Sequence, residues 1–194
     1  MRILFVCTGN TCRSPMAEAL LQKKIRELGK VGESLGEIEV QSTGLYKFKG
    51  MPVSPHTLTV LAEYGIQYDQ EPQGINQELI EWADLVLTMT RFHKYVTLTL
   101  FPEIIDKTFT LKEFVGEQSS YDISDPVGKS LSRYRQCAQE IDQALNRLQQ
   151  KLIQVSSETD KGFLSFPTPQ PLPRALPLLR WLMKLTKKSK KRHR

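Results

Sequence analysis

A cysteine and an arginine near the N-terminus are the residues best suited to chemistry. Cys7 follows an apolar run at residues 3–6, and Arg13 precedes a segment with helical spacing that begins at Pro15. This pattern predicts a strand, a tight loop and a helix. The first N–H groups of a helix lack internal acceptors, and together with the helix dipole they bind anions. The stretch therefore predicts an oxyanion site that holds a thiol.

The residue types within this loop suit phosphoryl transfer. A helix N-terminus and a neighbouring cation stabilise a thiolate at Cys7, which is a good nucleophile. The planar guanidinium of Arg13 can bind two oxygens of a phosphoryl group, and Ser14 can hydrogen-bond the sulfur. Gly9 and Asn10 tolerate the left-handed backbone that a curled loop requires. The plainer alternative is a loop cysteine beside a surface arginine.

Residues 7–15, Cys-Thr-Gly-Asn-Thr-Cys-Arg-Ser-Pro, resemble the phosphate-binding loop of the low-molecular-weight protein tyrosine phosphatases. The resemblance covers about residues 1–153. It implies a small α/β domain, a cysteinyl-phosphate intermediate, and neither a metal nor another cofactor. It also implies a general acid in a distant Asp-Pro pair, which this chain has at Asp125 and Pro126.

The resemblance places catalysis on Cys7, Arg13 and Asp125. Pro126 forces the residue before it out of the helical region, so Asp125 is expected on a loop and is preferred to its neighbour Asp122. The remaining loop residues are expected to bind the substrate: Thr8, Gly9, Asn10, Thr11, Cys12 and Ser14. Cys12 is also expected to form a protective disulfide with an oxidised Cys7, although a small buried residue would explain it too.

The identity of the phosphorylated side chain depends on fewer residues. Phosphotyrosine members of the family usually have a bulkier aliphatic residue where this chain has Thr11, and aromatic residues after the Asp-Pro pair, where it has Val127. At Thr11 the chain resembles the protein arginine phosphatase branch of the family. This resemblance favours phosphoarginine as the substrate, and phosphotyrosine is the alternative. The family also tends to have a histidine after residue 66 that supports the loop asparagine. This segment has none, so we expect Asn10 to be supported differently, by Ser14 and Ser42 at least.

Two further functions share this loop. An arsenate reductase needs additional redox cysteines in a mobile segment, and only Cys137 remains, inside a predicted helix. A non-catalytic phosphate-binding module would not need Cys7, Arg13 and Asp125 together. Both rank below a phosphatase that acts on phosphorylated proteins.

The periodicity predicts a three-layer α/β/α domain with a four-stranded parallel sheet. Apolar or alternating runs predict strands over residues 2–6, 37–42, 84–89 and 107–111. Apolar residues at helical spacing, with capping residues, predict helices over 15–28, 54–61, 76–83, 90–101 and 130–153. Residues 43–53 are expected to form a loop in which Tyr46 and Phe48 either wall the pocket or pack on the core.

Charge separates the domain from the C-terminal region. The net charge is +6, but residues 155–194 carry +8 and residues 1–154 carry −2, so a nucleic-acid-binding domain is not expected. We expect residues 154–173 to be a flexible linker. Residues 174–194 are expected to form a basic, possibly amphipathic tail that binds an anionic membrane surface or an acidic partner. Three cysteines and no secretory signal favour the cytoplasm.

Overall fold

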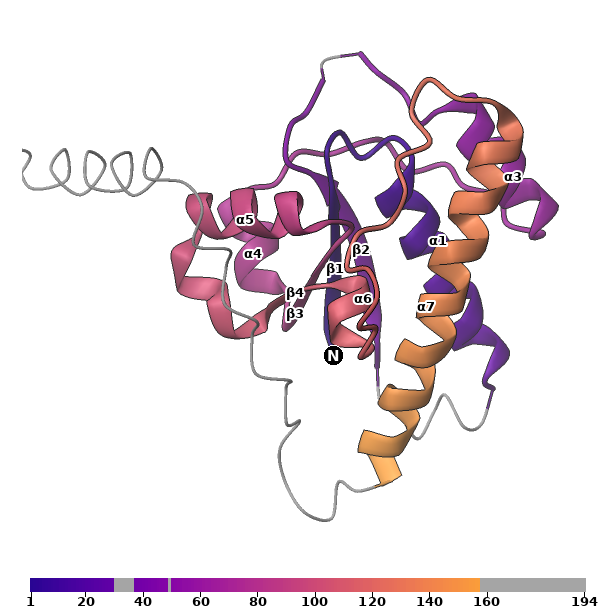
Figure 1. Ribbon diagram of the computed structural model, residues 1–194. Coiled ribbons are helices and arrows are strands. Elements are labelled where there is room, and N and C mark those ends of the chain that lie inside the picture. Colours follow the sequence, from indigo (N-terminus) through magenta and orange to yellow (C-terminus); the bar gives the residue numbers. More distant parts are fainter. Residues whose placement is uncertain (30–36, 49, 158–194) are drawn as a thin grey trace, which may run out of the picture.

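A four-stranded parallel sheet forms the centre of the computed structural model, which describes residues 1–29, 37–48 and 50–157 (Figure 1). Its strands are β1 (Arg2–Cys7), β2 (Glu39–Gly44), β3 (Leu85–Thr88) and β4 (Thr108–Thr110). They lie in the order β2-β1-β3-β4, and all pairs are parallel. Both faces of β1 are buried, which explains its continuous apolar sequence.

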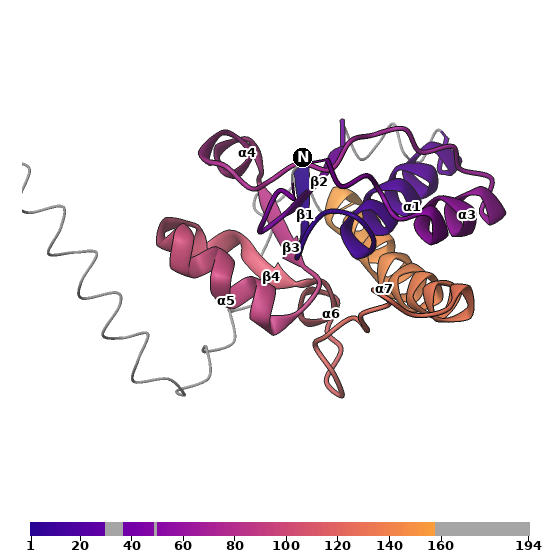
Figure 2. The same ribbon diagram turned by 90° about the horizontal axis from the view of Figure 1, so that it is seen from above.

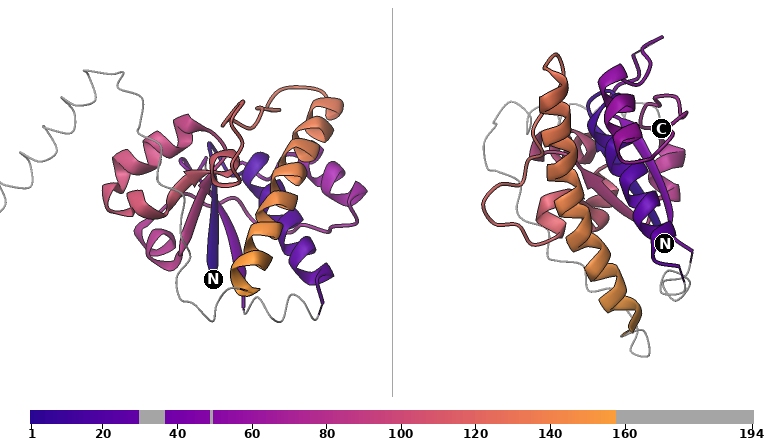
Figure 3. Two further views of the ribbon diagram at one scale, coloured as in Figure 1. Left: turned by 60° about the horizontal axis from the view of Figure 1, so that its bottom comes forward. Right: turned by 90° about the vertical axis from the view of Figure 1, so that its right-hand side faces the viewer.

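Helices cover both faces of the sheet and make three layers (Figure 2). One side holds α1 (Arg13–Glu27), α3 (Pro55–Glu63) and α7 (Leu131–Ser157), and the other holds α4 (Gln77–Trp82) and α5 (Arg91–Leu100). Helix α7 lies against α1 (Figure 3). The predicted apolar stripe begins at Leu131, which is partly buried, and its other members are buried in the core: Tyr134, Ala138, Ile141, Leu145, Leu148 and Leu152. The predicted three-layer fold is confirmed.

Several boundaries differ from the predictions for local reasons. Strand β2 extends to Gly44, because Thr43 and Gly44 pair with the last two residues of β1. The short helices η1 (Pro102–Lys107) and α6 (Leu111–Phe114) were not predicted; a capping box between Thr110 and Glu113 starts α6. Helix α7 ends four residues later than expected, at Ser157.

The topology predicts a crevice at the carboxyl ends of the strands. The chain leaves β1 through α1 toward β2, whereas β3 and β4 lie on the other side of β1. The strand order thus reverses direction at β1. Where the order reverses in a parallel sheet, the loops after the two adjacent strands diverge and leave a crevice at the carboxyl ends of those strands. The loops after β1 and β2 and the segment before α7 gather at this end (Figure 1).

The predictions for the C-terminal region fall mostly outside the described residues. The tail over 174–194 and all but the first four residues of the linker lie there. Within the part of the chain that the structure describes, none of the helices has the length and apolar character needed to cross a bilayer.

Candidate active site

Residues 8–12 curl into a loop between the end of β1 and the start of α1. The carbonyl groups of Cys7, Thr8 and Thr11 accept hydrogen bonds from residues 45, 46 and 54, at 2.9, 3.0 and 3.0 Å. Because a trans peptide places C=O and N–H on opposite sides, the N–H groups that follow these carbonyls point away from those neighbours. The loop therefore presents amide N–H groups on its inner side, as an anion site requires.

Close packing against β2 fixes the loop backbone. A Cβ atom added to Gly44 would lie 2.7 Å from the carbonyl carbon of Gly9 and 2.8 Å from the nitrogen of Asn10. Only glycine allows this approach. Asn10 itself has φ of 55°, the only positive value outside glycine among the described residues. The predicted left-handed turn in the loop is therefore located at Asn10.

The sulfur of Cys7 lies at the base of this loop. The Cys7 side chain is buried, and Ser14 Oγ donates a hydrogen bond to its Sγ at 2.9 Å. This is the contact predicted for Ser14. A hydroxyl donor at this distance can stabilise negative charge that develops on the sulfur.

The amide of Asn10 makes hydrogen bonds through both its nitrogen and its oxygen. Its Nδ2 donates to Ser14 Oγ at 3.0 Å and to Ser42 Oγ at 2.8 Å. Its Oδ1 accepts from the backbone N–H of Gln73 at 2.8 Å. The expected support from Ser14 and Ser42 is thus present, and the segment around Gln73 adds a contact that the sequence did not reveal.

Two further residues, Glu18 and Tyr68, extend this network away from the sulfur. Ser42 Oγ donates to Glu18 Oε2 at 2.6 Å, and the hydroxyl of Tyr68 donates to the same oxygen at 2.8 Å. Burial raises the pKa of Glu18, and the two hydrogen bonds offset part of that effect. Burial and the nearby Glu18 raise the pKa of Tyr68. A continuous relay therefore connects Tyr68 to Cys7 through four intervening side chains: Glu18, Ser42, Asn10 and Ser14.

The guanidinium of Arg13 and the carboxylate of Asp125 meet beside the loop. Arg13 Nη2 donates to Asp125 Oδ2 at 2.6 Å; the side chain of Arg13 is 5% exposed and that of Asp125 is 50% exposed. Asp122 lies elsewhere and accepts from the backbone N–H of Arg91 at 2.7 Å. The structure thus brings Asp125, and not Asp122, to the loop.

A buried histidine adjoins the loop on the side of β3. His93 Nε2 lies 2.9 Å from Thr8 Oγ1, and its Nδ1 lies 3.0 Å from Thr90 Oγ1. Burial, and then the charge of Arg13, lower the pKa of His93 to about 4, so the ring is neutral at pH 7. Sequence reasoning missed His93, because its only local signal is a polar residue at the start of α5.

The remaining loop residues have separate environments. Thr11 is half-buried, and its hydroxyl lies 3.5 Å from Cys12 Sγ. Cys12 is buried, and its Sγ lies 3.4 Å from the hydroxyl of Tyr134. Cys7 and Cys12 are both free thiols here, so the disulfide stays a prediction. The third thiol, Cys137, is buried in α7 and donates to the carbonyl of Ser124 at 3.3 Å.

Exposed apolar side chains surround the loop. Tyr46 and Phe48 are 53% and 46% exposed, which excludes the alternative that they pack in the core. The ring of Phe48 lies so close to Gly9 that an added Cβ would be 2.9 Å from it. Phe48 therefore lies directly against the phosphate loop, as a pocket wall would.

Comparison with known proteins identifies the class to which this fold and loop belong. A family model described as low molecular weight phosphotyrosine protein phosphatase matches residues 2–158. The chain belongs to this family and is a protein phosphatase.

The individual relatives include phosphatases named for two different substrates. A protein-arginine-phosphatase of Geobacillus stearothermophilus is 44% identical over 78% of this chain and 95% of its own length. One from Bacillus subtilis (strain 168) is 42% identical over 78% and 97%. A low molecular weight protein-tyrosine-phosphatase, PtpB of Staphylococcus haemolyticus, is 36% identical over 73% and 92%. The solved YwlE arginine phosphatase from G. stearothermophilus aligns with a TM-score of 0.72 at 42% identity, covering 84% of this chain and 99% of that one.

The buried His93 predicts a specific pH dependence of stability. The unfolded chain binds a proton at this residue below about pH 6.5, whereas the folded chain does so only near pH 4. The stability contributed by neutral His93 is therefore complete above about pH 6.5 and is lost as the pH falls toward 4. Between pH 7 and pH 5 the loss should be about 2 kcal/mol.

Urea unfolding of the wild type and of His93→Gln, at both pH values, measures this contribution. Other titrating groups act on both proteins, so the pH-dependent difference between them isolates His93. Parallel pH dependences of the two unfolding free energies would contradict the prediction.

The relay from Tyr68 predicts a second, kinetic effect. Tyr68→Phe removes the hydroxyl that donates to Glu18 and keeps the ring. Loss of one hydrogen bond, about 1 kcal/mol, should lower kcat for p-nitrophenyl phosphate about fivefold and leave KM unchanged. Tyr64→Phe is a matched control, because Tyr64 lies outside the relay. If the two variants had the same kcat, the relay would have no influence on turnover.

Proposed function

We propose that this phosphatase removes phosphate from phosphoarginine in proteins, with Cys7 as nucleophile, Arg13 as phosphate ligand and Asp125 as general acid. One observation supports these three roles. The hydrogen-bonded sulfur of Cys7 and the paired side chains of Arg13 and Asp125 belong to one loop and its immediate border, although Asp125 is 112 positions from Arg13 in the sequence.

In the first step, the thiolate of Cys7 attacks phosphorus. A P–S bond forms while the bond from phosphorus to the guanidino nitrogen breaks. The carboxyl group of Asp125, which takes up a proton from solvent once it has left Arg13, gives that proton to the departing nitrogen. The inward N–H groups of the loop and the guanidinium of Arg13 stabilise the charge on the phosphoryl oxygens. For this, Arg13 turns from the carboxylate of Asp125 toward the phosphoryl group.

In the second step, water releases the phosphate. The carboxylate of Asp125 takes a proton from water as its oxygen attacks the phosphorus of phosphocysteine. The P–S bond breaks and inorganic phosphate leaves. The sulfur departs as a thiolate, which the hydrogen bond from Ser14 stabilises. In support, one structural relative is described as a YwlE arginine phosphatase, a C7S mutant with phosphorylated active site serine; its TM-score is 0.72 at 38% identity, with 78% of this chain and 95% of that chain covered.

The preference for phosphoarginine has two supports. Two relatives at 44% and 42% identity are named arginine phosphatases. In this chain Thr11 leaves a small, polar side chain at a loop position where phosphotyrosine members of the family carry a bulkier aliphatic one. Phosphotyrosine stays the second candidate, because a relative at 36% identity is named a tyrosine phosphatase.

Substitution of the proposed catalytic residues tests the mechanism. We expect Cys7→Ser to abolish hydrolysis of p-nitrophenyl phosphate while inorganic phosphate still binds. Asp125→Asn should lower kcat by about 10²–10⁴-fold, the usual contribution of general acid–base catalysis. Asp122→Asn is the matched control, because this nearby carboxylate is bound to Arg91, and it should retain wild-type turnover within about twofold. Equal losses in the two aspartate variants would exclude Asp125 as the acid.

Substitution of Thr11 tests the substrate preference. The ratio of kcat/KM for phosphoarginine over phosphotyrosine peptides should fall about tenfold in Thr11→Ile, because an added apolar group changes the shape and polarity of the pocket. Thr59→Ile on the exposed side of α3 makes the same change away from the loop. A ratio that stays unchanged in Thr11→Ile would remove the basis for the phosphoarginine assignment.

A further inference from the structure

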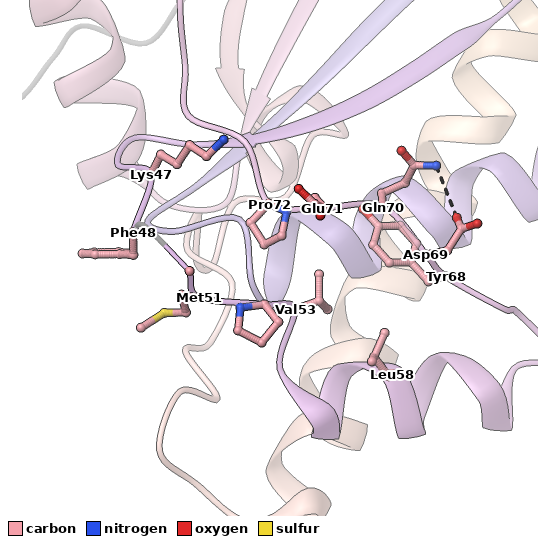
Figure 4. Close-up of a pocket in the computed structure, with 12 residues that line it drawn as sticks. Lys47, Phe48, Met51, Val53, Leu58, Tyr68, Asp69, Gln70, Glu71 and Pro72 are labelled. Carbon is pink, nitrogen blue, oxygen red and sulfur yellow. Dashed lines mark hydrogen bonds between the residues drawn. The ribbon is translucent and has the colours of Figure 1, made fainter.

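A hollow of about 370 Å³ lies beside the phosphate loop, between residues 47–48 and 50–53 on one side and residues 68–72 on the other. Figure 4 shows the two segments on either side of it, with Phe48 and Met51 toward one end and Tyr68 and Asp69 toward the other. Tyr68, at the far end of the relay, lines it, but neither the proposed catalytic residues nor the residues of the phosphate loop do. The hollow is thus distinct from the phosphate site.

Large apolar side chains border this hollow and are open to solvent. Phe48, Met51 and Leu58 are 46%, 51% and 40% exposed. Contiguous exposed apolar groups on a protein surface often mark an interaction site. Burial of these side chains against an apolar group of a ligand is favourable, because it removes apolar surface from water.

Two carboxylates and one cation give the lining of the hollow a net negative charge. Asp69 and Glu71 line it and are exposed, and neither has an ion pair with a described residue. Lys47 is the only cation among the described lining residues. The charge therefore favours a cationic group, such as a lysine or arginine side chain, at the wall formed by residues 68–72.

Phe48 joins the hollow to the phosphate loop. Its ring lies against Gly9 and also lines the hollow. A ligand that reaches both places must be extended, and consecutive residues of an extended peptide are up to about 3.6 Å apart. A few residues of peptide beside a phosphorylated side chain can therefore span from the loop past Phe48.

We propose that this hollow is a subsite for the segment of the protein substrate that flanks the phosphorylated residue. It takes apolar side chains against Phe48 and Met51 at one end and against Leu58 toward the other, and a lysine or arginine beside Asp69 and Glu71 (Figure 4). The inference rests on the proposed function, and it specifies which phosphorylated sequences the enzyme prefers.

Two phosphopeptides with the same phosphorylated residue test the subsite. One has leucine and arginine on both sides of that residue, and the other has glycine and glutamate. The wild type should hydrolyse the first with a kcat/KM about tenfold higher. The double variant Asp69→Asn, Glu71→Gln should lose about three- to tenfold for the first peptide, and Leu58→Ser should lose a similar factor. Neither should change turnover of p-nitrophenyl phosphate, which has no flanking residues to place in the hollow.

A matched control separates the subsite from a general effect of charge. The double variant Glu103→Gln, Asp106→Asn removes the same charge from η1, on the other side of the sheet, and should behave as the wild type with every substrate. Equal turnover of the two peptides by the wild type, or equal losses in the two double variants, would overturn the subsite while leaving the phosphatase assignment intact. Hydrolysis of p-nitrophenyl phosphate but of neither peptide would contradict the proposed function itself. The subsite proposal, which rests on that function, would then be excluded too.

Discussion

The buried amide of Asn10 holds the active site together. The left-handed backbone at this residue costs about 1–2 kcal/mol, and the three hydrogen bonds of the side chain offset that cost. Those bonds reach Ser14 on α1, Ser42 on β2 and the backbone at Gln73. Three segments that are distant in sequence therefore meet at one polar side chain, and the curled loop requires all of them.

Electrostatic pairing around Arg13 sets the resting state of the site. Its guanidinium is almost fully buried, and the carboxylate of Asp125 balances its charge. A buried charge without a partner is costly, so the pair with Asp125 stabilises the buried guanidinium. In the proposed mechanism, an entering phosphoryl group supplies new negative charge to Arg13, and Asp125 becomes available for proton transfer. Because half of the Asp125 side chain is exposed, water can solvate the carboxyl group once it leaves Arg13.

The features that were predictable from sequence are local ones. One short stretch of residue types predicts the strand, loop and helix around Cys7 and Arg13. The long amphipathic pattern of α7 predicts that helix just as clearly. Asp125 was found only because a family resemblance supplied a distant partner. Helix α6 was missed, because four residues are too few to show periodicity.

The supporting residues were harder to predict, because their roles arise from tertiary contacts. Glu18 lies between Ala17 and Ala19 in a helix segment that is wholly buried. A charged residue in such a run is a signal that it has a buried polar partner. The partner, Tyr68, is 50 positions away, and nothing in either local sequence connects the two. His93 shows the same limit, since its ring bonds to Thr8 across 85 positions.

The environment of Cys137 has a practical consequence for chemical labelling. Burial raises the pKa of this thiol to about 12, so it stays protonated at neutral pH and reacts poorly with electrophiles, which attack thiolates. The chain has three cysteines, and the other two belong to the phosphate loop. An alkylating reagent added to the folded protein therefore reports on the loop thiols alone, and the number of adducts seen by mass spectrometry measures how many of them are reduced and accessible.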